Sequence, residues 1–160
     1  MKPRIPPPVL MLLAAALMWS VHRWWPIARL LTTPWNRLGA FPTAVGIVVA
    51  AAAITQFRRS RTTLNPIEPS RASHLVTAGI FGVSRNPMYL GLLLLLIGWA
   101  LWLGSASPWF VPPLFAILIY AAQIVPEERA LEALFGKSYI AYRQKVARWI
   151  GRSGEAVRGQ

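Results

Sequence analysis

Four long apolar stretches dominate the pattern of hydrophobic and polar positions along the chain. They cover Val9 to Val21, Phe41 to Phe57, Met88 to Gly104 and Pro108 to Val125. Each is near the roughly 17 to 25 residues that an α-helix needs to cross a bilayer, although the first is the shortest. The pattern therefore predicts an all-α integral membrane protein with about four transmembrane helices.

After Val125 the pattern becomes that of a surface helix. Apolar residues recur at steps of three and four with basic residues around them, which is typical of an amphipathic helix at the inner leaflet of a membrane. The apolar positions are Leu131, Leu134, Phe135, Tyr139, Tyr142, Val146 and Trp149. Gly136 predicts a break into two helices, with Ser138 capping the second. We expect these to be C-terminal amphipathic cytoplasmic helices.

The composition agrees with a membrane chain. The 160 residues have room for one domain, and 55% of them are hydrophobic. The mean hydropathy of +0.43 is too high for an ordinary soluble domain. We therefore expect residues 1–160 to form a single membrane domain, with residues 151–160 as a flexible tail.

Lys and Arg residues are divided unevenly between the two expected sides of the membrane. If the N-terminus lies inside, the inner segments hold fourteen of the 17 Lys and Arg residues, and the outer segments hold Arg23, Arg29 and Arg37. The positive-inside rule therefore selects an N-in, C-in topology. The same topology places a belt of aromatic residues at the outer interface, namely Trp24, Trp25, Trp35, Trp102 and Trp109.

The net charge of +12 then has a simple explanation. Basic residues set the topology and attract anionic lipid headgroups, so we expect membrane lipids as partners and no nucleic acid.

The residue inventory excludes several kinds of chemistry. Cysteine is absent, which removes disulfides, thiolate metal sites and cysteine nucleophiles. With only His22 and His74 in the chain, no metal site is expected. Carboxylate chemistry has few candidates, because Asp is absent and the glutamates are Glu68, Glu127, Glu128, Glu132 and Glu155.

The third and fourth apolar stretches are joined by the short connection "GSASP", so they must form an antiparallel hairpin. The polar ends of this hairpin then meet on one side of the membrane, with Arg85, Asn86 and Tyr89 opposite Glu127 and Glu128. Ionisable residues at a membrane edge are often paired and functional. Each residue also has a simpler explanation, because glutamates favour the first turn of a helix and Arg and Tyr anchor helix ends. Their joint occurrence favours a site.

Three segments carry a resemblance to a known family. "SHLVTAGIFGVSRNPMYLG", "PEERALEALFG" and "SYIAYRQKV" resemble the C-terminal core of the isoprenylcysteine carboxyl methyltransferase and phospholipid methyltransferase superfamily, over residues 62–150. The resemblance implies an integral-membrane enzyme of the EC 2.1.1 type, which uses S-adenosylmethionine to methylate a lipid or other hydrophobic acceptor at the cytoplasmic face. It also implies the inner membrane of a bacterial or archaeal cell.

Carried over to this sequence, the resemblance assigns roles to particular residues within the cofactor-binding core 62–150. Arg85 and Glu128 are the implied catalytic residues, and Gln123 is the implied substrate residue. The implied cofactor-binding residues are Ser73, His74, Leu75, Val76, Phe81, Asn86, Pro87, Met88, Tyr89 and Glu127. These types suit the cofactor, because a carboxylate can bind its ribose or ammonium, an Arg its carboxylate, and an aromatic face its sulfonium.

Two positions leave the methyl acceptor open. Asn86 stands where the carboxyl-methylating branch usually has His, and Gln123 stands where that branch has an Arg. The motif "NPMY" is closer to the phospholipid N-methyltransferase version.

Two other functions remain possible from the sequence. One is an NADPH-binding enzyme like the sterol reductases, which have a similar Arg/His-Tyr motif, Glu pair and terminal Tyr-containing helix. The other is a small non-catalytic lipid-binding or scaffold protein of the membrane, because a fold does not determine a function.

Overall fold

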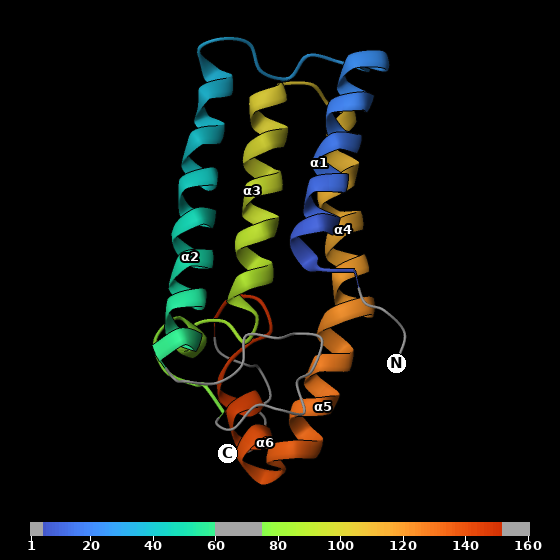
Figure 1. Ribbon diagram of the computed structural model, residues 1–160. Coiled ribbons are helices and arrows are strands. Elements are labelled where there is room, and N and C mark those ends of the chain that lie inside the picture. Colours follow the sequence, from blue (N-terminus) through green and yellow to red (C-terminus); the bar gives the residue numbers. More distant parts are fainter. Residues whose placement is uncertain (1–4, 60–74, 152–160) are drawn as a thin grey trace, which may run out of the picture. The chain divides into compact units, whose positions relative to one another are not determined.

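The computed structural model describes residues 5–59 and 75–151, and this part of the chain is helical (Figure 1). The α-helices are α1 (Pro7–Trp24), α2 (Ala40–Arg59), α3 (Pro87–Leu103), α4 (Val111–Ile119), α5 (Val125–Phe135) and α6 (Lys137–Lys145). Short 3₁₀ helices are η1 (Trp35–Gly39), η3 (Gly79–Gly82) and η4 (Ser107–Phe110), and a π-helical segment, η5 (Tyr120–Ile124), joins α4 to α5. The predicted all-α fold is confirmed for the described residues.

A helix forms at each of the four predicted apolar stretches. Two continuous helical segments, Trp35–Arg59 and Ser107–Phe135, are long and apolar enough to cross a membrane, and Pro87–Leu103 is a shorter apolar helix. By length and composition, these helices suit a membrane-spanning role.

The described residues form two compact units. The first contains the residues up to Val48 together with Gly91–Tyr120, and the second contains Val49–Leu90 together with the residues from Ala121 onward. Helices α2 and α3 each pass from one unit into the other.

In the first unit, α2 and α3 approach closely along a stripe of glycines. A Cβ atom on Gly46 would lie 2.8 Å from the carbonyl oxygen of Gly91, and a Cβ on Gly98 would lie 2.7 Å from that of Gly39. Gly39, which ends η1 directly before α2, and Gly46 on α2 have the same spacing as Gly91 and Gly98 on α3. The pairing runs in opposite directions, so the helices are antiparallel. Close approach of backbones at small residues is a common way to associate helices in membranes, where lipid removes the hydrophobic drive.

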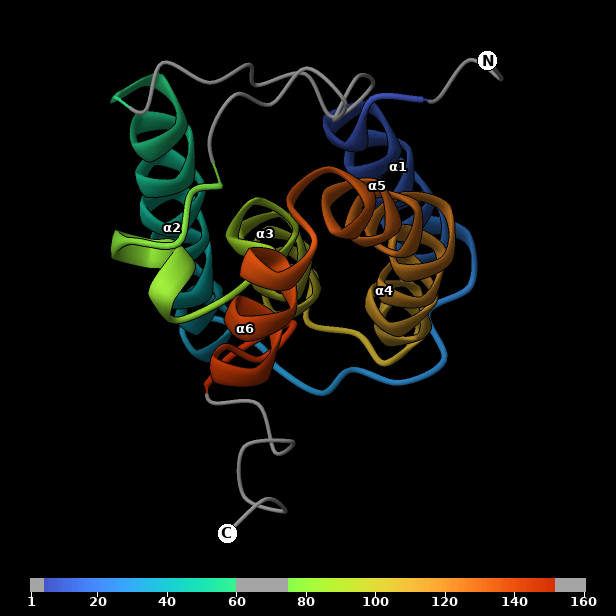
Figure 2. The ribbon, with the colours of Figure 1, turned by 90° about the horizontal axis from the view of Figure 1, so that it is seen from below.

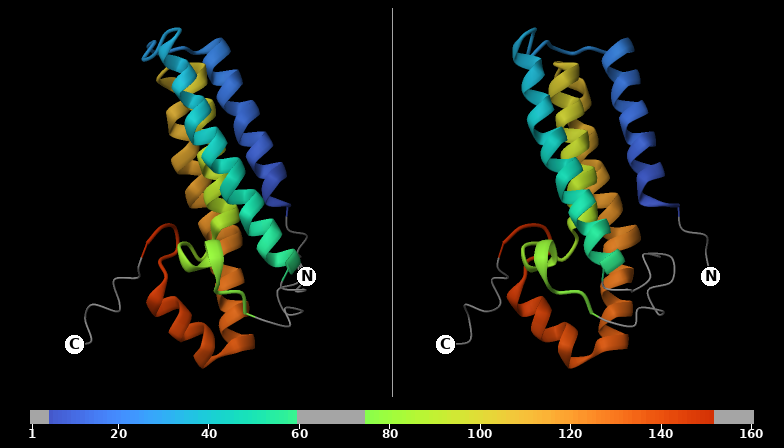
Figure 3. Two further views of the ribbon diagram at one scale, coloured as in Figure 1. Left: turned by 90° about the vertical axis from the view of Figure 1, so that its left-hand side faces the viewer. Right: turned by 60° about the vertical axis from the view of Figure 1, so that its left-hand side comes forward.

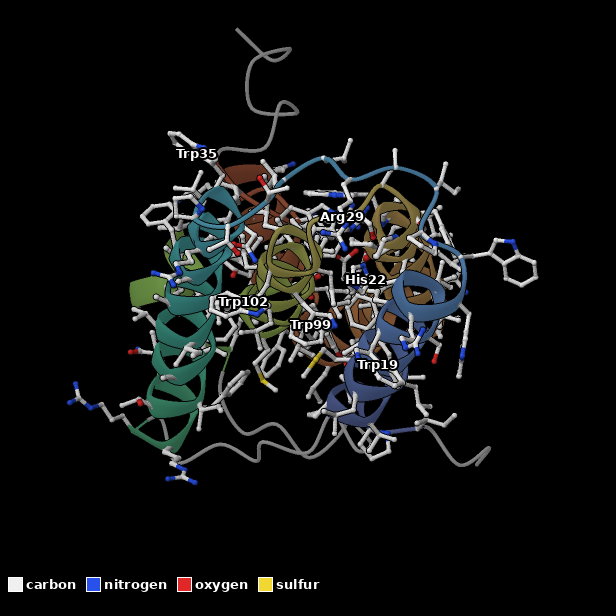
Figure 4. The ribbon with its side chains drawn as sticks, turned by 90° about the horizontal axis from the view of Figure 1, so that it is seen from above. Trp19, His22, Arg29, Trp35, Trp99 and Trp102 are labelled. Carbon is white, nitrogen blue, oxygen red and sulfur yellow. The ribbon has the colours of Figure 1, made fainter. Side chains whose placement is uncertain are left out.

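Helix α1 packs against α4 and η4 in the same unit, and the helices run alongside one another (Figure 3). Trp99 on α3 donates a hydrogen bond to the carbonyl of Ala15 on α1 at 3.2 Å. Figure 4 shows Trp99 and His22 lying between these helices, whereas Trp35 lies at the edge of the unit. Of the Trp residues predicted for an outer belt, Trp109 is half-buried and the others are exposed.

The connection after α1 is hydrogen-bonded to the turn between α3 and η4. The amides of Leu30 and Leu31 both donate to Gly104, at 2.8 and 3.0 Å. The His22 Nδ1 atom lies 2.7 Å from the hydroxyl of the buried Ser105. Gly104 has φ +73° and its missing Cβ leaves room for the Leu31 carbonyl, so both its conformation and its surroundings favour glycine.

In the second unit, the chain stays helical from η5 into α5 and then breaks. Pro126 lacks an N–H, and its ring disturbs the carbonyl four residues earlier, which explains a π segment directly before α5. The predicted break at Gly136 is confirmed, with φ +50° between α5 and α6. The predicted Ser138 cap is wrong. Gly136 occupies the N-cap position itself, without a side-chain cap, so Ser138 already belongs to the first turn of α6.

Candidate functional site

The second unit places the segment before α3 beside the residues that follow α6 (Figure 2). We call Ala147–Gly151 the C-terminal clasp. Its Ala147 carbonyl accepts a hydrogen bond from the Arg85 amide at 3.0 Å, and the Gly151 amide donates to Val83 at 3.0 Å. The clasp therefore holds the backbone on which the predicted site residues begin.

Glu128 lies at the centre of a cluster of charges. Arg148 of the clasp donates to both carboxylate oxygens of Glu128, from Nε at 3.0 Å and from Nη2 at 2.7 Å. The Nη1 atom of Arg85 lies 3.0 Å from Glu128 Oε1. Two guanidinium groups thus share one carboxylate, and positive charge is in excess among these three groups.

Arg85 is the most enclosed of these charged groups. Its side chain is 8% exposed, compared with 11% for Glu128 and 33% for Arg148. Its Nε and Nη1 atoms have no hydrogen-bond acceptor with suitable geometry among the described residues. Because a buried guanidinium donor without an acceptor is costly, this group is suited to receive an anionic oxygen from a ligand.

A second contact joins the start of α3 to α5. The hydroxyl of Tyr89, at the start of α3, donates to Glu127 Oε1 at 2.5 Å. Tyr89 is buried and Glu127 is half-buried. The short charge-assisted hydrogen bond orients the Glu127 carboxylate.

Asn86 takes part in fixing the clasp. Its Nδ2 atom donates to the carbonyl of Arg148 at 3.3 Å, and its backbone amide donates to the Ser84 hydroxyl at 3.1 Å. The Ser84 hydroxyl itself donates to the same Arg148 carbonyl at 3.3 Å. The Asn86 side chain therefore connects two chain segments.

Two tyrosines of α6, Tyr139 and Tyr142, lie beside the charge cluster. The Tyr142 hydroxyl donates to the Phe81 carbonyl at 2.7 Å. Burial, and then the charge of Glu128, raises the pKa of Tyr139, although a hydrogen bond from the Arg85 side chain acts against this. Burial also raises the pKa of Tyr142. Both phenols are thus neutral at physiological pH, and both rings pack with Val146 in one apolar cluster.

The remaining predicted site residues have varied surroundings. Ser73 and His74 lie outside the described residues. Leu75 packs against the apolar cluster of α6, and Phe81 is buried against Phe57 with ring centroids 4.9 Å apart. Of the others, Val76 and Met88 are half-buried, whereas Pro87 and Gln123 are buried. The structure thus brings Arg85, Asn86, Tyr89, Glu127 and Glu128 together, and their functional roles stay predictions.

Sequence reasoning missed Arg148 and Tyr139 as members of this cluster. Arg148 counted only as one basic residue of an amphipathic segment, and Tyr139 only as an apolar position. Neither residue carried a signal in its own part of the sequence, because Arg148 pairs with Glu128, which Arg85 already meets, and this depends on the fold. No group of three or more residues able to hold a metal ion occurs in the part of the chain that the structure describes.

Comparison with known proteins identifies the family. The sequence model of the phospholipid methyltransferase family matches residues 35–138. The chain belongs to this family. The match includes both the motif around Arg85 and the glutamate pair on α5, and it confirms the resemblance to the superfamily.

Curated relatives of this phospholipid methyltransferase family member include methyltransferases. Protein-S-isoprenylcysteine O-methyltransferases B and A of Arabidopsis thaliana are 29% identical over 114 residues and 31% identical over 115 residues. The alignments cover 69% and 70% of this chain but 56% and 57% of the plant enzymes, so the chain spans just over half of their length. An uncharacterized protein of Haemophilus influenzae is 48% identical over 63 residues, which are 39% of this chain and 100% of that protein. No solved structure is significantly similar to the chain.

Proposed function

We propose that this family member is a membrane methyltransferase that uses S-adenosylmethionine and methylates a lipid or other hydrophobic acceptor at the cytoplasmic face. The observation that carries the proposal is the buried Arg85 side chain next to the Tyr89–Glu127 hydrogen bond. Among the described residues its Nε atom has no hydrogen-bond acceptor, and its Nη1 atom lies 3.0 Å from Glu128 without a suitable hydrogen-bond geometry. The membership of the family supports the reaction class.

The donors and acceptors of the site fit the cofactor. Its amino-acid end carries a carboxylate, which a buried guanidinium with spare donors can bind through charge-assisted hydrogen bonds. Its ribose hydroxyls and its ammonium are donors, and Glu127 offers carboxylate oxygens to them. The aromatic rings of Tyr89 and Phe81 are both buried in this unit and are candidates for attraction to a sulfonium.

When bound, S-adenosylmethionine would supply an electrophilic methyl group. The contribution of this chain is then mainly alignment, because methyl transfer needs the nucleophile, the methyl carbon and the sulfur in line. Tyr89 holds the Glu127 carboxylate through its 2.5 Å hydrogen bond. Glu128 holds Arg85 by the ion pair at 3.0 Å. Burial of these groups excludes water and strengthens their electrostatic effect.

We assign Asn86 a binding role and not that of a base. An amide does not titrate, and its Nδ2 atom is bonded to the Arg148 carbonyl at 3.3 Å. The acceptor must therefore bring its own nucleophile, or lose its proton to another group. Gln123, buried in the π segment directly before α5, stays our candidate for contact with the acceptor.

The proposed topology has four spans, namely α1, α2, α3 and the continuous helix from η4 through α4 into η5. Both termini lie inside, with the C-terminal amphipathic helices at the inner leaflet. The support is the charge bias of the sequence and the exposed Trp residues of the first unit. A bacterial or archaeal inner membrane remains part of this proposal.

Calorimetry on the purified chain in detergent tests the function. We expect S-adenosylmethionine to bind, and Glu127→Ala to weaken the binding strongly. Glu132→Ala is the matched control, because Glu132 also lies on α5 but pairs with Arg143 at 2.9 Å in a half-exposed ion pair. Absence of binding, or equal binding by both variants, would overturn the proposal. Binding of NADPH without binding of the methyl donor would favour a reductase.

Transfer of label from the cofactor's methyl group into a total lipid extract tests the acceptor. A labelled lipid is the expected product. Cofactor binding without any transfer, to lipids or to other hydrophobic acceptors, would favour a non-catalytic protein.

A further inference from the structure

Arg148 forms a bidentate pair with the Glu128 carboxylate. Its Nε and Nη2 atoms donate to the two different oxygens, at 3.0 and 2.7 Å. Such bidentate pairing fits the planar guanidinium to the planar carboxylate and is the strongest way to join them. The Nη1 atom of Arg85 lies 3.0 Å from Glu128 Oε1, an oxygen that already accepts from Arg148 Nε.

The backbone of Arg148 acts on the residues to either side of Arg85. Its carbonyl oxygen accepts hydrogen bonds from the Ser84 hydroxyl and from Asn86 Nδ2, both at 3.3 Å. The neighbouring Ala147 carbonyl accepts from the amide of Arg85 itself, at 3.0 Å. The clasp thus fixes the position of the Arg85 backbone, and the Arg148 side chain competes with Arg85 for the Glu128 carboxylate.

We propose that Arg148 is a positioning residue, which keeps the buried donors of Arg85 available for the carboxylate of the cofactor's amino-acid end. This inference rests on the proposed function. Without the Arg148 side chain, both oxygens of Glu128 are open to Arg85. Arg85 would then form the bidentate pair itself, and its donors would turn away from the ligand. The site would also lose one of the two positive charges that balance Glu127 and Glu128, so it would attract an anion less strongly.

The chain contains a matched control for this effect. Arg143 and Glu132 form another ion pair between α6 and α5, at 2.9 Å, with side chains that are 35% and 39% exposed. The residue types and the parent helix of the glutamate are the same, but the solvent exposure of this pair is greater. Replacing Arg143 therefore removes an equal charge without changing what Arg85 can bind.

Two ligands separate a positioning effect from general damage. S-adenosylhomocysteine has the amino-acid end, and 5′-methylthioadenosine lacks it, while both carry the adenosine and the sulfur. Calorimetry would measure both affinities for the full-length wild type, Arg148→Met, Arg148→Lys and Arg143→Met in the same detergent. The ratio of the two affinities reports on recognition of the amino-acid end, and the affinity for 5′-methylthioadenosine reports that the rest of the site is folded.

For the wild type we expect a preference for S-adenosylhomocysteine of about tenfold or more, which is the effect of one charge-assisted hydrogen bond. Arg148→Met should reduce this preference about tenfold and change the affinity for 5′-methylthioadenosine less than threefold. Arg148→Lys should restore part of it, because Lys keeps the charge but not the fork. Arg143→Met should leave the preference unchanged.

An unchanged preference in Arg148→Met, or an equal loss of both affinities, would overturn the positioning role while leaving the proposed function standing. A wild type that binds neither ligand would overturn the proposed function and this inference with it.

Discussion

Replacing Glu128 by Gln tests the charge cluster most directly. The substitution keeps the shape of the side chain but removes the charge that two guanidinium groups share. Arg148 loses an acceptor for one of its two hydrogen bonds, because the new amide nitrogen is itself a donor. Arg85 and Arg148 then lie close together without a counter-charge.

The structure sets the size of the effect. Breaking a buried ion pair by removing one partner costs about 3 to 5 kcal/mol. The side chains of Arg85 and Glu128 are 8% and 11% exposed, but that of Arg148 is 33% exposed, so water screens part of the new repulsion. We therefore expect a loss near the lower end of this range, about 3 kcal/mol, which corresponds to a fall in Tm of about 6 to 12 °C for a chain of this size.

Thermal melting of the purified protein in detergent, followed by circular dichroism, measures this loss. Glu132→Gln is the control, since its half-exposed pair with Arg143 contributes about 0.5 kcal/mol. High salt should abolish the small effect at Glu132 and leave most of the effect at Glu128. If the two variants melt at the same temperature, the cluster does not stabilise the second unit and the reasoning is refuted.

Three further predictions concern other contacts. Tyr89→Phe removes the 2.5 Å hydrogen bond to Glu127 and should weaken binding of S-adenosylhomocysteine about tenfold in calorimetry. An affinity equal to that of the wild type would show that this hydrogen bond does not contribute to cofactor binding. Gly98→Ala should destabilise the chain by about 1 to 3 kcal/mol in thermal melts, because its Cβ would collide with the Thr43 hydroxyl and lie 2.7 Å from the Gly39 carbonyl oxygen. Gly82→Ala, with its nearest contact at 3.7 Å, should cost much less, so equal losses would contradict the close helix packing. Because burial raises the pKa of Tyr139 above its ordinary 10.0, the folded chain keeps a proton that the unfolded chain loses, and stability should be full below about pH 10 and fall above it. Tyr139→Phe should reduce the fall in Tm with rising pH. A fall as steep as that of the wild type would show that Tyr139 does not cause it.

Local rules predicted most of the helices. Apolar stretches of membrane length became helices because, without water, the backbone must satisfy its own hydrogen bonds. Gly136 ended α5 as expected, since glycine adopts a positive φ without strain. The cap of the next helix could not be found in this way, because the same glycine took the N-cap position and Ser138 fell inside the helix.

The approach of Tyr89 to Glu127 was also predictable. In the structure the Tyr89 hydroxyl lies 2.5 Å from Glu127 Oε1. A connection as short as "GSASP" makes the two flanking helices antiparallel neighbours, and residues at matching depths then come close. The sequence therefore indicated that the two motifs lie close together.

The sequence by itself determined the helices, the membrane character and the pairing of the two motifs, because these follow from hydropathy and from the length of one turn. Only the tertiary structure decided that Arg148 pairs with Glu128 at 2.7 Å and that Gly46 meets Gly91. The reason is physical. A pairing between residues far apart in the chain depends on how the intervening turns direct it, and neither an Arg nor a Gly shows in its own neighbourhood which distant group it will meet.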